Sequence, residues 1–151
     1  MRLKVDNVGP ALSAAAESAR FGPPTVVLPR LGQGSFRVLI TETYTRRCAI
    51  TLERTLPVLE AAHIRPFSIV GAHELSNGLL LRSDLHTLFD RGYLGVDPKE
   101  RRVMVSSRIR EEFENGKDYY SLQGRPLASP ADKAAVPAFE NLLYHAEHVF
   151  R

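Results

Sequence analysis

Apolar positions in the middle of the chain fall in short runs that predict strands, and later at a spacing that predicts helices. Residues 36–45 carry an apolar run that fits either a helix or a strand. The runs at 48–51 and 58–64 predict the two strands of a hairpin. Pro66 ends the second strand, because its nitrogen cannot donate to a ladder. A loop rich in turn residues is expected over 67–78.

A helix is expected directly after this loop and three consecutive leucines. Its apolar residues fall at i, i+3 and i+4 and predict the buried face: Leu85, Leu88 and Phe89. Ser83 is the expected N-cap and Gly92 the expected stop. His86 and Asp90 are four residues apart, so their side chains share another face of the same helix and can converge on one point.

The C-terminal half predicts a second hairpin and further helices. Residues 93–96 and 102–105 flank a turn sequence, and 107–114 is helical in pattern. A final helix is expected over 137–149, and its expected inward-facing residues are Val136, Phe139, Leu142 and Leu143. The succession of hairpin, loop, helix, hairpin and helix predicts an α+β fold.

Composition and length bound the kind of protein. The 151 residues, 44% hydrophobic and 25% charged, fit one globular domain, expected over 31–151, preceded by a leader or remnant segment at 1–30. No apolar run approaches the roughly 18 residues of a membrane span, and the start has no signal-peptide pattern, so a cytoplasmic location is expected. The single Cys48 excludes an internal disulfide and a cysteine-based zinc ribbon, and it is expected in a strand of the core.

The net charge is only +3, but positive charge is concentrated in one stretch of the chain. The stretch from Arg30 to Arg54 holds five arginines against only Glu42 and Glu53. Arginine forks match phosphate oxygens, so this stretch is a candidate nucleic-acid surface. An ordinary solvated basic face explains the same pattern equally well.

Three histidine- and asparagine-bearing segments carry the candidate chemistry. They are AAHIRP at 61–66, ELSNGL at 74–79 and DLHTLFD at 84–90. The order of a histidine at a strand end, an asparagine in a loop and a histidine on the next helix resembles the HNH endonuclease family. The resemblance runs from about residue 31 to the C-terminus and is sharpest at 48–97, with a C-terminal helix similar to one bacterial, restriction-endonuclease-like branch.

The resemblance implies a ββα-metal core, in which a hairpin and a helix hold one divalent cation, here with an added hairpin and C-terminal helices. It implies that His63 is the general base, since a neutral imidazole can take a proton from water near neutral pH. His86 and Asp90 are implied as metal ligands. Asn77 corresponds to the loop asparagine that braces the loop and helps to orient the base.

The implied activity is metal-dependent hydrolysis of DNA, expected to be duplex, with Mg²⁺ as the expected cation and Mn²⁺ or another transition metal as alternatives. Arg65 and Arg82 are candidate phosphate contacts from their position alone. A homodimer or a partner protein is expected to contribute to targeting.

One departure from the family leaves a second function open. Many members carry Asp or His directly before the base as a metal ligand, and this chain has Ala62. Glu60, on the same strand face, is a candidate to reach the metal instead. A non-catalytic nucleic-acid-binding module with a degenerate metal site is the alternative, because the departure removes a ligand.

Overall fold

A computed structural model of the chain describes residues 32–70 and 73–151, so the leader expected at 1–30 lies outside the described residues. The fold is α+β, as predicted. Its helices and strands are α2 (Gln33–Thr43), β1 (Leu59–His63), α3 (Phe67–Val70), β2 (Gly78–Arg82), α4 (Ser83–Asp90), β3 (Leu94–Val96), β4 (Val103–Val105), α5 (Arg108–Phe113), α6 (Lys117–Tyr120) and α7 (Phe139–His148). Short 3₁₀ turns add η1 (Leu56–Val58), η2 (Leu75–Asn77) and η3 (Lys133–Ala135).

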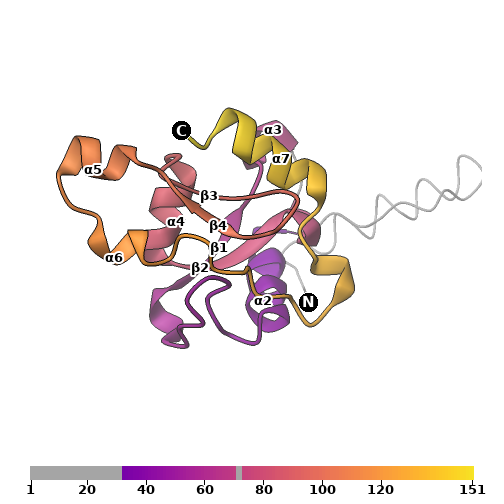
Figure 1. Cartoon of the computed structure of the whole chain (residues 1–151). Coiled ribbons are helices and arrows are strands. Elements are labelled where there is room, and N and C mark those ends of the chain that lie inside the picture. Colours follow the sequence, from indigo (N-terminus) through magenta and orange to yellow (C-terminus); the bar gives the residue numbers. More distant parts are fainter. Residues whose placement is uncertain (1–31, 71–72) are drawn as a thin grey trace, which may run out of the picture.

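The first hairpin joins β1 to β2, with His63 opposite Gly78 in an antiparallel register. Helices α2 and α4 both pack against it, and Figure 1 shows α2 and α4 as separate layers around the two strands. At Gly78 a Cβ would lie 2.5 Å from Ile40 Cδ1, so only glycine allows α2 to approach this closely. The α2 helix therefore lies against the end of the hairpin that carries His63.

The predicted pairing of 48–51 with 58–64 is wrong. Cys48 is fully buried, as expected, but the segment forms turns, and Leu52 has a φ of 65° that no strand allows. The amide of Ala49 donates to the Leu80 carbonyl over 2.7 Å, so the segment covers β2 through one backbone contact. The apolar run at 48–51 correctly indicated a buried segment, but the strand that pairs with β1 is β2, which lies after it in the chain.

Helix α4 forms where it was expected, with Leu85 and Phe89 buried. Gly92 ends it with a φ of 83°, and a Cβ there would lie 2.1 Å from the Val149 carbonyl oxygen. Ser83 is not the N-cap, because its hydroxyl donates to the Val58 carbonyl. The N-cap position is Arg82, which makes no side-chain capping bond.

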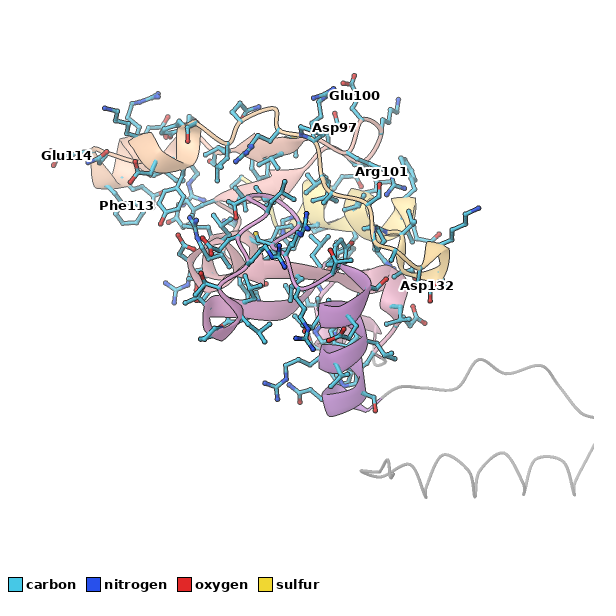
Figure 2. The ribbon with its side chains drawn as sticks, turned by 90° about the horizontal axis from the view of Figure 1, so that it is seen from below. Asp97, Glu100, Arg101, Phe113, Glu114 and Asp132 are labelled. Carbon is cyan, nitrogen blue, oxygen red and sulfur yellow. The ribbon has the colours of Figure 1, made fainter. Side chains whose placement is uncertain are left out.

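The second hairpin, β3 with β4, is confirmed. Its turn is stabilised by Asp97, whose side chain accepts the Lys99 and Glu100 amides. Helices α5 and α6 follow and extend away from the core (Figure 1). Figure 2 shows Phe113 and Glu114 at the outer end of this extension, where the Phe113 side chain is exposed.

Helix α7 closes the domain by packing on β3 and burying Leu142 and His145. The prediction that Val136 and Phe139 face inward is wrong, since they are 36% and 47% exposed. Val136 precedes α7, and the helix presents the face of Leu142 to the core in place of that of Phe139. Among the described residues, none of the helices combines the length and apolar character that crossing a membrane requires.

Candidate active site

One cavity of about 320 Å³ collects the candidate residues from distant parts of the chain. Its wall is formed by the end of β1, the start of α3, one face of α4 and the C-terminal turns of α7. The lining residues are His63, Ile64, Pro66, Phe67, His86, Asp90, His145 and Val149. The structure therefore brings the two imidazoles and the carboxylate singled out in the sequence to a single cavity.

His63 lies on an aromatic side of this cavity. The Phe36 ring of α2 stacks on it at a centroid distance of 4.4 Å, with the two rings 2° from parallel. Its Nε2 lies 3.0 Å from Nδ1 of His73, within hydrogen-bond distance. Burial lowers the pKa of the His63 imidazole, and the neighbouring His73 lowers it further. A neutral imidazole at ordinary pH is the form that can accept a proton.

His86 lies on an acidic side. Its Nδ1 is 2.7 Å from Glu60 Oε1, and its Nε2 is 3.1 Å from Asp90 Oδ2, one helical turn away. The bond to Asp90 and then the bond to Glu60 outweigh desolvation and raise the pKa of His86 to about 9. In the absence of another cation, the imidazolium is thus the favoured form of His86.

The donor pair on α4 fits a divalent cation that keeps most of its waters. Two ligands at right angles around a small hard cation lie about 3.0 Å apart, close to the His86–Asp90 separation. Glu60 does not sit on that nitrogen: it accepts from the opposite ring nitrogen, as carboxylates do behind metal-binding histidines. In the described part of the chain no group of three or more His, Cys, Asp or Glu side chains gathers around one point. The chain therefore offers a pair of donors here, whose imidazole must give up a proton to bind.

Asn77 is fully buried in the η2 turn, and it braces the segment after His63. Its Oδ1 accepts the Arg65 amide over 2.8 Å, and its Nδ2 donates to the Arg65 carbonyl over 2.9 Å. The Ile64 amide donates to the Asn77 backbone carbonyl. Three bonds from one residue fix the direction in which the chain leaves β1, and with it the end of the strand that holds His63.

The two candidate phosphate contacts differ in their surroundings. The Arg65 guanidinium lies 4.8 Å from the Tyr144 ring centroid, one residue before the cavity wall at Pro66. Arg82 binds Asp84 through two bonds of 2.7 and 3.0 Å, and Tyr119 donates to the same carboxylate. Arg65 is therefore near the cavity, whereas the guanidinium of Arg82 is already engaged in the fold.

Several residues around the cavity had no role in the sequence analysis. His73 and Phe36 carry no spacing signal toward His63, and only the fold places them there. His145 is buried, with its ring stacked on Phe89 at a centroid distance of 3.7 Å. Its Nε2 donates to the Phe89 carbonyl over 2.8 Å, and burial lowers its pKa to about 4. His145 is thus a neutral structural imidazole that fastens α7 to the end of α4.

Comparison with known proteins shows which proteins this chain resembles. Residues 48–97, the segment with β1, β2, α4 and β3, match the family model described as HNH endonuclease. A solved structure, a modification dependent TagI restriction endonuclease, is similar in fold with a TM-score of 0.56 and 22% identity, over 76% of this chain. That match spans only 37% of the TagI chain. No curated protein matches the sequence. Residues 48–97, which include His63, His86 and Asp90, are thus similar to the HNH endonucleases, a family of phosphodiester hydrolases.

Proposed function

We propose that this chain is a metal-dependent endonuclease that hydrolyses DNA phosphodiester bonds, with His63 as general base and His86 and Asp90 as metal ligands. The observation that carries the proposal is the cavity itself. Its lining combines the His63 imidazole, whose pKa is lowered, with the His86–Asp90 pair, whose nearest nitrogen and oxygen lie 3.1 Å apart. In-line hydrolysis of a phosphodiester needs both functions.

In the proposed reaction a water molecule attacks phosphorus while its proton passes to the His63 ring. The new P–O bond forms as the bond from phosphorus to the 3′ oxygen breaks, and that oxygen takes a proton from solvent. The products are a 5′-phosphate and a 3′-hydroxyl, as the resemblance to the family implies. A divalent cation bound by His86 and Asp90 would supply charge neutralisation at the phosphate and the departing oxygen.

Other residues of the chain position the substrate and the base. Asn77 keeps the segment from Ile64 to Arg65 fixed, so that His63 projects into the cavity. Arg65, at the cavity edge, is proposed to contact a phosphate through its guanidinium fork. Arg82 would do so only after releasing Asp84, so we assign it a smaller contribution.

The substrate class and the physiological setting are part of the proposal. We propose duplex DNA as the substrate and restriction as the setting, supported by the match to the HNH endonuclease model and by the fold shared with the TagI restriction endonuclease. Because this chain spans about a third of that protein, target choice is proposed to come from another domain, a partner or a second copy.

Cleavage of supercoiled plasmid tests the proposal. The wild-type chain should nick or cut the DNA with Mg²⁺ or Mn²⁺, and should not do so in chelator. His63→Ala, purified in the same way, should lose this activity. Equal cleavage by wild type and His63→Ala would assign the activity to a contaminant and remove the support for the proposal.

The second candidate is a nucleic-acid-binding module without catalysis, favoured by Ala62 in place of a third ligand. It predicts salt-sensitive binding of DNA in a mobility-shift assay with no cleavage under any divalent metal. Metal-dependent cleavage that disappears in His63→Ala would reject it.

A further inference from the structure

The His63–His73 contact has no place in the reaction described above. His73 comes from the loop between β1 and β2, and its Nδ1 lies 3.0 Å from Nε2 of His63. Phe36 stacks on His63, and Phe67 stacks on His73 at 4.3 Å. The two imidazoles therefore meet edge to edge between two phenyl rings, and a half-turn of either ring would put a carbon in place of its contacting nitrogen.

This contact determines which nitrogen of His63 can act as the base. A neutral imidazole has one N–H and one lone pair, on different nitrogens. Nε2 is occupied by His73, whereas Nδ1 has no hydrogen-bond partner among the described residues and is not among the buried polar atoms. If Nδ1 is to accept a proton from water, Nε2 must carry the hydrogen, and His73 must accept it.

We propose that His73 is a positioning residue for the base: its Nδ1 accepts the Nε2 hydrogen of His63 and thereby fixes the tautomer whose Nδ1 lone pair is free to take a proton. The proposal rests on the assignment of His63 as general base made above. It assigns to His73 the orienting role that a carboxylate or a backbone carbonyl serves beside many catalytic and metal-binding histidines.

An imidazole acceptor differs from a carboxylate because it adds no charge. Burial lowers the pKa values of both His63 and His73, so both rings are neutral at ordinary pH. The other titratable groups of the cavity, His86 and Asp90 of α4 and His145 of α7, lie on other walls. A carboxylate in place of His73 would stabilise the imidazolium and keep the base protonated. His73 orients the ring without this cost, and the bond becomes charge-assisted once His63 has taken the proton.

The first test measures the tautomer and needs neither metal nor DNA. In the full chain labelled with ¹⁵N-histidine, ring nitrogen shifts should show His63 hydrogen-bearing at Nε2, with His63→Ala identifying the signals. His73→Phe, which keeps an aromatic ring beside Phe67 but no acceptor, should give a mixture of both tautomers. A wild-type His63 protonated at Nδ1 would overturn the proposal, as would an unchanged tautomer in His73→Phe.

The second test uses plasmid cleavage kinetics. In His73→Asn the amide oxygen can stand where Nδ1 stood, so most of kcat should remain. His73→Phe should lose roughly tenfold to hundredfold in kcat with little change in KM, since the base is misoriented while DNA binding is untouched. His73→Asp should move the acidic limb of the kcat–pH profile to higher pH. His148→Asn, the same change at an exposed histidine of α7, is the matched control and should behave as wild type.

The outcomes separate this proposal from the function on which it rests. Equal losses of kcat in His73→Asn and His73→Phe would indicate a packing role and reject the positioning role, as would full activity in both. A wild-type chain that shows the expected tautomer but never cleaves DNA would reject the nuclease assignment and leave the His63–His73 bond in place.

Discussion

The two sides of the cavity place the same side chain in opposite environments. His63 has rings around it (Phe36, Phe67 and His73) and its pKa is lowered. His86 lies between two carboxylates and its pKa is raised to about 9. The first environment yields a neutral base, and the second attracts positive charge, whether a proton or a metal cation. The neighbours therefore assign the roles, and the imidazole itself does not.

Replacing His63 and His86 separately should give the largest effects and should separate their two roles. His63→Ala should reduce the cleavage rate by about 10² to 10⁴, because it removes general base catalysis, while Mn²⁺ binding is retained. His86→Ala should lose Mn²⁺ binding as well as cleavage. Calorimetry with Mn²⁺ and plasmid cleavage on the same samples check both. If both variants lost metal binding, the two sides would form one metal site and the comparison would fail.

The two rings should differ in proton affinity, because the pKa of His63 is lowered and that of His86 is raised. In a metal-free NMR titration of histidine ring protons, His86 should titrate near pH 9 and His63 below pH 6.5. Asp90→Asn should bring the His86 pKa down, since the bond to Asp90 is the largest cause of its rise. Two similar midpoints in the wild type would contradict the contrast.

His145, another histidine whose pKa burial lowers, should make the stability of the fold depend on pH. Its pKa is about 4 in the fold against 6.5 for an ordinary histidine, so the unfolded chain binds more protons between these values. Its contribution to the free energy of unfolding is complete above pH 6.5 and should fall by about 3 kcal/mol as pH drops toward 4. Urea denaturation at several pH values measures this loss.

His145→Phe is the control for that loss, because it keeps a ring against Phe89 but cannot titrate. It should be less stable at pH 7, by about 1 kcal/mol, because the Phe89 carbonyl loses the His145 donor and keeps only the 3.3 Å bond from the Gly92 amide. Its stability should also depend less on pH than that of the wild type. An identical pH dependence in both proteins would show that His145 is not the titrating group.

Glu60→Gln should have the smallest effect of these variants, and it tests whether the carboxylate behind His86 contributes to metal binding. The amide oxygen can still accept from His86 Nδ1, so the fold should persist, but the negative charge behind the ring is lost. Metal affinity should fall by about tenfold to hundredfold in calorimetry. Glu100→Gln, in the exposed turn between β3 and β4, is the matched control. Wild-type affinity in Glu60→Gln would remove Glu60 from the metal site.

The local elements of this fold were largely predictable. Helix α4 and the β3–β4 hairpin were confirmed because helical spacing and a tight turn are local signals. The β1–β2 hairpin was missed because a loop of 14 residues separates its strands and no local pattern names the partner. The apolar run at 48–51 predicts a different partner, but local backbone bonds such as Leu52 to Cys48 close it into turns.

The sequence alone identified the candidate groups: a histidine at the end of a strand, and a histidine and an aspartate that the helical period brings to one face of a helix. Only the tertiary structure decided what each group faces. Glu60 reaches His86 across 26 positions of the chain, and His73 and Phe36 enclose His63 from other elements. Burial and hydrogen-bond partners set the protonation of an imidazole, and both arise from long-range packing that no local stretch of sequence encodes.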